Sequence, residues 1–67
     1  MKHLSNYSLE EFKEMFKTLP NDVIEIVHGY YHRDRNYTVA AFAYKQGIST
    51  ATLYRYINKI KKNYSCI

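Results

Sequence analysis

Apolar side chains recur every three or four residues along most of this chain, which is the spacing of an amphipathic α-helix. Four segments show this spacing, and the predicted helices span about residues 9–18, 20–31, 39–46 and 50–63. The pattern therefore predicts an all-α fold with four helices. With a length of 67 residues, the chain is long enough for one small domain, which we expect to cover residues 1–67.

The first two predicted helices carry clear boundary signals. Ser8 and Glu11 fit a capping box, in which each side chain accepts a hydrogen bond from the other residue's backbone N–H. Pro20 ends the first helix and fits the first turn of the second, where Gly29 permits close contact with another helix. The preceding segment 1–7 is expected to be loose, with Leu4 and Tyr7 against the first helix. The apolar faces of the two helices comprise Leu9, Phe12, Met15, Phe16 and Leu19, then Val23, Ile24, Val27, Tyr30 and Tyr31.

The last two predicted helices are separated by a short turn. Thr38 is placed to cap residues 39–46, Gly47 can adopt positive φ, and Ser49 is placed to cap residues 50–63. The apolar faces on either side of the turn comprise Val39, Phe42 and Ala43, then Leu53, Tyr56, Ile57, Ile60 and Tyr64. A tight corner between two helices, the second of them basic, is typical of a helix-turn-helix that binds DNA.

Charge is divided unevenly along the chain. Residues 1–32 carry three lysines and five acidic residues, a balance of −2, whereas residues 33–67 carry seven cationic residues and one acidic residue, a balance of +6. This asymmetry predicts that the C-terminal half faces a polyanion. Nucleic acid fits better than a membrane, because the basic half lacks the wide apolar face of an interfacial helix. A basic surface that serves only solubility is the alternative.

The turn region resembles the helix-turn-helix of bacterial and phage regulators. Ala43 lies four residues before Gly47 and is followed by Ile48, Ser49 and Leu53. In that family the small residue lets the two helices approach, the glycine makes the turn, and the apolar residues fix the recognition helix. The wider layout, with Leu19-Pro20 before a preceding helix, is similar to region four of bacterial sigma factors.

The resemblance implies sequence-specific binding of double-stranded DNA by a small bacterial or phage transcriptional regulator. Two alternatives stay open. One is a recombination or excision accessory factor. The other is a protein-interaction module that binds or mimics part of RNA polymerase, or binds another regulator, through the acidic helix 9–18. A homodimer formed through helix 9–18 or the tyrosine-rich C-terminal end is also an open alternative.

Helix 50–63 supplies most of the expected DNA contacts. With Leu53 inward, a rotation of about 100° per residue turns its polar side chains outward. Arginine pairs with guanine, asparagine pairs with adenine, and an alanine methyl group contacts thymine. The residues expected to read base edges are Thr50, Ala51, Arg55 and Asn58. The residues expected to contact phosphate are Arg33, Arg35, Thr38, Lys45, Thr52, Tyr54, Lys59 and Lys62.

The sequence gives little support for catalysis, for cofactor or metal binding, or for membrane association. There is no Ser/His/Asp pattern and no glycine-rich phosphate loop, so we expect neither enzymatic activity nor a cofactor. His28 and His32 have a spacing that suits a metal, but a third ligand would have to be His3 or Cys66 near the chain ends, and no metal site is expected. The single cysteine and the lack of a long apolar run predict a cytoplasmic protein without membrane association.

Overall fold

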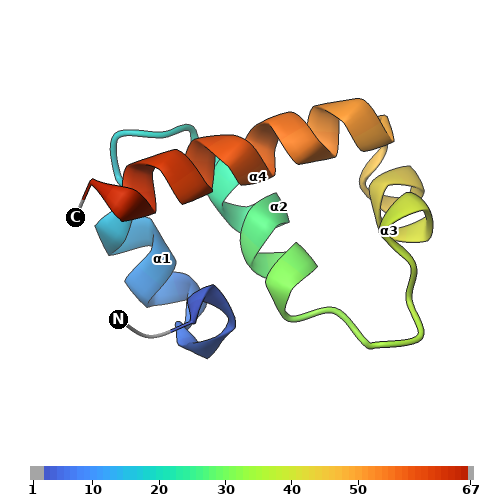
Figure 1. Cartoon of the computed structure of the whole chain (residues 1–67), viewed down its shortest axis with the longest axis horizontal. Helices are drawn as coiled ribbons and strands as arrows, with labels where there is room; N and C mark the ends of the chain where they lie inside the picture. The colour runs from blue at the N-terminus through green and yellow to red at the C-terminus, as the bar shows by residue number, and fades with distance from the viewer. Residues whose placement is uncertain (1–2, 67) are drawn as a thin grey trace.

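The computed structural model describes residues 3–66 and is all-helical in that range (Figure 1). Its α-helices are α1 (Leu9–Met15), α2 (Asn21–Tyr31), α3 (Val39–Gln46) and α4 (Thr50–Ser65). A short 3₁₀ turn, η1 (Leu4–Asn6), precedes them. The all-α class predicted from the sequence is thus confirmed. Figure 1 shows α4 crossing above α2, with its C-terminal end near α1 and its N-terminal end near α3.

Helix α1 is shorter than predicted. Its capping box is present, since the backbone N–H of Ser8 donates to Oε1 of Glu11 at 2.9 Å and the N–H of Glu11 donates to Oγ of Ser8 at 3.2 Å. The helix ends at Met15 and not near residue 18, because Phe16 leaves helical geometry and is buried at 1% exposure. The N–H of Leu19 then bonds the carbonyl of Phe16 at 2.8 Å, which closes a turn before Pro20.

The structure also differs from the prediction at Pro20, at the end of α4 and in the segment before α1. Pro20 has extended backbone (ψ 144°) and precedes α2 as its N-cap, so it does not lie in the first turn. Helix α4 runs two residues past the predicted end at 63, and the hydroxyl of Ser65 donates to the carbonyls of Lys61 and Lys62. The segment expected to be loose contains η1, which packs against α2 and buries Leu4. Met1 and Lys2, of the same segment, lie outside the described residues.

Helix α2 lies at the centre of the fold and contacts η1, α1, α3 and α4. A Cβ atom on Gly29 would lie 3.3 Å from Cζ of Phe42, so the glycine allows the close contact between α2 and α3 that the sequence predicts. No helix within residues 3–66 combines the length and apolarity needed to cross a bilayer. The buried core comprises Leu4, Phe12, Phe16, Val23, Ile24, Val27, Phe42, Ala43, Leu53, Ile57 and Ile60.

Candidate nucleic-acid interface

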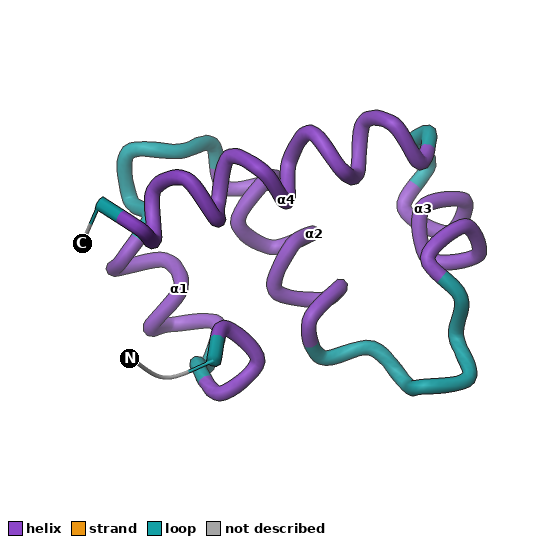
Figure 2. The backbone as a smooth tube through the Cα atoms, in the orientation of Figure 1, coloured by secondary structure: helices purple, strands orange, loops and turns teal. Residues whose placement is uncertain are grey.

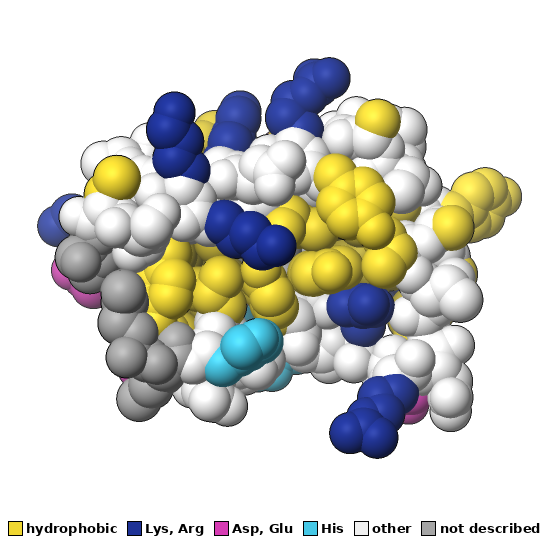
Figure 3. All heavy atoms as spheres, in the orientation of Figure 1, with side chains coloured by type: hydrophobic (Ala, Val, Ile, Leu, Met, Phe, Trp, Pro, Cys, Tyr) yellow, Lys and Arg dark blue, Asp and Glu magenta, His cyan; other side chains and the backbone are white. Residues whose placement is uncertain are grey.

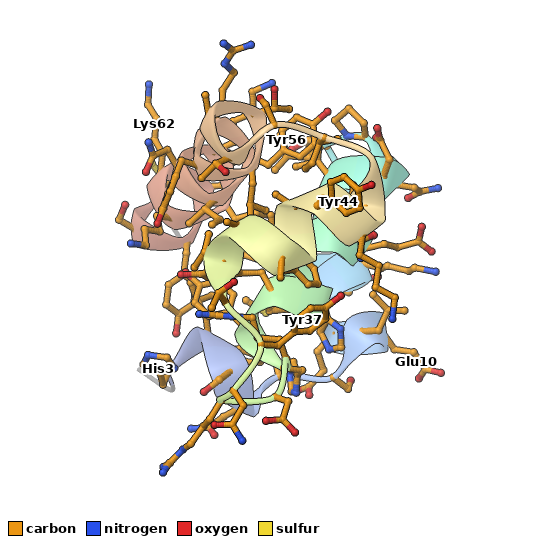
Figure 4. The ribbon with its side chains drawn as sticks, turned by 90° about the vertical axis from the view of Figure 1, so that its right-hand side faces the viewer. His3, Glu10, Tyr37, Tyr44, Tyr56 and Lys62 are labelled. Carbon is orange, nitrogen blue, oxygen red and sulfur yellow. The ribbon has the colours of Figure 1, made fainter. Side chains whose placement is uncertain are left out.

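The corner between α3 and α4 is closed by a Schellman motif. Gly47 has φ +75°, its N–H donates to the carbonyl of Tyr44 at 3.0 Å, and the N–H of Ile48 donates to the carbonyl of Ala43 at 3.1 Å. Ser49 then caps α4, because its Oγ accepts from the N–H of Thr52 at 3.1 Å. Figure 1 looks nearly along α3 while α4 runs across the view, and Figure 4 shows α3 running across, so the two helices cross steeply.

Helix α4 separates an apolar face from a polar one. Leu53, Ile57 and Ile60 are buried, with Leu53 and Ile60 at 0% exposure. On the opposite side and flanks, the exposed residues of α4 are Thr50, Ala51, Tyr54, Arg55, Asn58, Lys59, Lys61, Lys62 and Ser65. Figure 3 shows cationic side chains along the upper edge of the molecule, over α4. The four residues predicted to read bases are therefore all on the exposed surface of one helix.

The cationic side chains of α4 form no ion pair with an acidic side chain among the described residues. The ion pairs found in that range join Lys13 to Glu25 at 3.7 Å and Lys17 to Glu14 at 3.8 Å, and both involve only α1, α2 and the turn between them. From residue 35 onward the sequence contains no aspartate or glutamate at all. The exposed side of α4 is consequently a region of uncompensated positive charge, which attracts an anionic ligand.

The predicted phosphate contacts before α3 lie elsewhere in the molecule. The guanidinium group of Arg33 donates to the carbonyl of Tyr30 at 2.7 Å and to that of Tyr37 at 3.1 Å, and it also lies over the Tyr30 ring at 4.2 Å. Arg35 is exposed in the same loop. Figure 2 shows this loop between α2 and α3 at the edge of the molecule away from α4. Arg33 thus stabilises the loop, and the loop that contains both arginines lies away from α4.

Three further predicted phosphate contacts belong to α3 and to the first turn of α4, and one of them, Thr38, lies at the end of α3 opposite the Gly47 corner. Thr38 is exposed and caps α3, since its Oγ1 accepts from the N–H of Ala41 at 3.1 Å. Lys45 is exposed on α3, and its Nζ atom lies 5.8 Å from the centre of the Tyr37 ring. Oγ1 of Thr52 accepts a hydrogen bond from the Ser49 hydroxyl at 2.9 Å, so that hydroxyl belongs to the cap of α4.

One cationic residue of this surface was not among the predicted contacts. Lys61 is exposed on α4, seven residues after Tyr54 and therefore on the same flank of the helix. Helical spacing could have identified it, because residues seven apart lie almost in line along an α-helix. The structural role of Arg33 had no such signal, since its partners are two backbone carbonyls on either side of an irregular loop.

The two histidines with metal-like spacing form a stacked pair. The rings of His28 and His32 lie 4.2 Å apart at an interplanar angle of 29°, and Nε2 of His32 donates to the carbonyl of Tyr7 at 3.0 Å. Burial, and then the neighbouring His32, lower the pKa of His28 below its ordinary value. Within residues 3–66, no group of three His, Cys, Asp or Glu side chains is placed to hold a metal ion.

Comparisons of this chain with protein-family models, with curated proteins and with solved structures found no match. Inference about function therefore depends on the geometry and charge of the α3–α4 surface.

Proposed function

We propose that this protein binds double-stranded DNA in a sequence-specific way, as a small bacterial or phage transcriptional regulator. In this proposal α3 and α4 form a helix-turn-helix, and α4 enters the major groove. The observation that carries the proposal is the exposed face of α4, which is cationic, forms no ion pair within the described residues, and lies opposite the buried apolar face of the same helix. The Schellman motif at Gly47 sets the turn between α3 and α4.

The length of α4 suits a helix that enters the groove at its N-terminal end. Sixteen residues give a helix about 24 Å long, whereas the major groove is about 12 Å wide. The groove curves around the duplex, so a straight helix of this length cannot follow it throughout, and in a helix-turn-helix the N-terminal residues of the recognition helix contact the base edges. Thr50, Ala51 and Arg55 lie in the N-terminal half and Asn58 lies at the middle of the helix, whereas three lysines follow in the C-terminal half and then lie at the phosphate backbone.

The side chains in each half match these two environments. The guanidinium group of Arg55 can donate two hydrogen bonds to one guanine, and the amide of Asn58 can both donate to and accept from one adenine. Lys59, Lys61 and Lys62 supply charge without the geometry needed for reading bases, which suits phosphate. We assign base reading to the first half of α4 and electrostatic attachment to the second.

The distribution of acidic residues is compatible with this orientation. Figure 4 shows Glu10 and Lys62 on opposite sides of the molecule, so DNA at α4 would be remote from Glu10. Glu14 and Glu25 are paired with lysines, and Glu11 belongs to the capping box of α1. These interactions leave a protein-only function, through the acidic surface of α1, with less support than DNA binding.

Duplex DNA selected from a random library, compared with scrambled duplex, tests the proposal. We expect enrichment of a defined sequence and tighter binding of the selected duplex. If Lys59, Lys61 and Lys62 neutralise three phosphates, the log–log salt slope is about −2.7, and affinity falls about fortyfold between about 50 and 200 mM salt. Absence of binding to either duplex at low salt would reject DNA binding and favour the protein-interaction alternative.

A further inference from the structure

Tyr54 is the most exposed large apolar side chain on α4. It is 47% exposed, whereas Tyr44 on α3 is 86% exposed and the apolar ridge of α4 is buried. A single exposed aromatic side chain is ordinary on a protein surface, so a functional role for Tyr54 has to follow from its position. Figure 3 shows apolar surface over the N-terminal half of α4, below the cationic upper edge.

The position of Tyr54 on α4 indicates a role in DNA recognition. Residues three and four apart are neighbours on a helix surface, with Cβ atoms about 5–6 Å apart. The neighbours of Tyr54 at these spacings are Thr50, Ala51 and Asn58, which are exposed, and Ile57, which is buried in the core. Three of the four residues assigned to base reading are thus next to Tyr54. A helix that brings Thr50 and Asn58 to base edges must also bring the ring between them.

Resting on the proposed function, we infer that Tyr54 is a further specificity-determining residue, which reads the C5-methyl group of a thymine. In the major groove that methyl group is the one apolar feature of a base pair, and apolar side chains recognise it by contact. A tyrosine ring offers a large contact area, and its two rotatable side-chain bonds keep the entropic cost of ordering it low. Part of the side chain is already covered by the protein, which restricts it further.

The competing assignment for Tyr54 is a phosphate contact through its hydroxyl group. The two assignments require different parts of the side chain. Contact with a methyl group needs the ring and not the hydroxyl, so Tyr54→Phe should preserve it and Tyr54→Ala should abolish it. Contact with phosphate needs the hydroxyl, so both substitutions should weaken binding, and they should do so on every duplex alike.

Replacement of thymine by uracil in the selected duplex removes only the methyl group and provides the test. We expect one thymine at which this replacement weakens wild-type binding about fourfold, the equivalent of one buried methyl group at about 0.8 kcal/mol. Tyr54→Phe should retain the fourfold penalty, and Tyr54→Ala should lose it at that thymine alone. Tyr44→Ala, which removes the more exposed tyrosine of α3, is the matched control and should also retain it.

Two results would overturn the inference while leaving the proposed function intact. In one, Tyr54→Ala keeps the full uracil penalty at every thymine. In the other, Tyr54→Ala and Tyr54→Phe weaken selected and scrambled duplexes equally. Selection that yields no preferred sequence would instead reject the proposed function itself, and the assignment of Tyr54 with it.

Discussion

At the scale of single residues, Gly47 shows a position where backbone geometry alone demands glycine. Its φ is +75°, and a Cβ atom there would meet no heavy atom within 4 Å, so any cost of substitution is conformational. Gly47→Val should lower the free energy of unfolding by about 1–3 kcal/mol. Gly47→Asn is the control and should cost less, because asparagine tolerates positive φ better than other residues. Urea unfolding of both variants tests this, and an unchanged stability of Gly47→Val would contradict it.

A second prediction concerns the stacked histidines. The pKa of His28 lies below its ordinary value of 6.5, first because the ring is partly buried and then because His32 is adjacent. The folded protein therefore binds this proton less tightly than the unfolded chain does. As the pH falls below about 6.5, the unfolded chain takes up more protons, and the free energy of unfolding decreases. Above that pH the stability no longer depends on this group.

The test compares wild type with His28→Phe, which keeps a ring beside Phe12 but cannot titrate there. Urea midpoints at about pH 7.5 and about pH 5.5 should differ less in the variant than in wild type. A fall of equal size in both proteins would show that His28 does not carry the pH dependence.

Residue-level features were predictable where the partners are close in sequence. Ser8, Thr38 and Ser49 each cap a helix through a backbone N–H three residues further on, so the cap can be read from a short segment. Arg33 is the contrary case. It donates hydrogen bonds to the carbonyls of Tyr30 and Tyr37, and only the folded loop brings these partners into reach. The phosphate contact that the sequence predicts for Arg33 stays a prediction.

At the scale of helices, periodicity identified all four, and local signals fixed α3 to its observed bounds. The end of α1 was not predictable in this way. Phe16 continues the helical spacing of apolar residues, but the chain leaves helical geometry there while the ring stays buried in the core. That competition between helix continuation and core packing is tertiary, so periodicity within one segment cannot reveal it.

The packing of α4 gives the third prediction. Leu53 is fully buried within the core cluster that also contains Phe42, Ile24 and Val27. Leu53→Ala should lower the free energy of unfolding by about 2–5 kcal/mol, which is comparable with the whole stability of so small a domain. Lys59→Ala, on the exposed side of α4, should leave stability nearly unchanged. Cooperative thermal unfolding of Leu53→Ala near the wild-type midpoint would contradict this packing.

At the scale of the molecule, the fold decides which cationic residues can act together. Sequence alone grouped Arg33 and Arg35 with the lysines of α4, because all of them lie in the basic half of the chain. The loop between α2 and α3 instead places the two arginines at the edge away from α4 (Figure 2). Their separation depends on how the helices pack, which neither charge balance nor helical spacing encodes.

The last prediction distinguishes base reading from phosphate binding on α4. Arg55 and Lys62 lie seven residues apart on the exposed face, so they share a direction but differ in depth along a helix that is longer than the groove is wide. Arg55→Ala should cost about 1–3 kcal/mol on the selected duplex and relax the preference at one base pair, with little effect on scrambled duplex. Lys62→Ala should weaken both duplexes by similar factors and reduce the magnitude of the salt slope by about one unit.

Binding of both variants to both duplexes across a salt series measures the two effects together. Lys17→Ala is the matched control, because Lys17 pairs with Glu14 beside α1 and lies outside the proposed interface. It should leave the salt slope for both duplexes unchanged. If Arg55→Ala weakens selected and scrambled duplexes equally, α4 attaches the protein to DNA but does not read its sequence. The base-reading role proposed for the first half of the helix would then be wrong, while the electrostatic role of its lysines would remain.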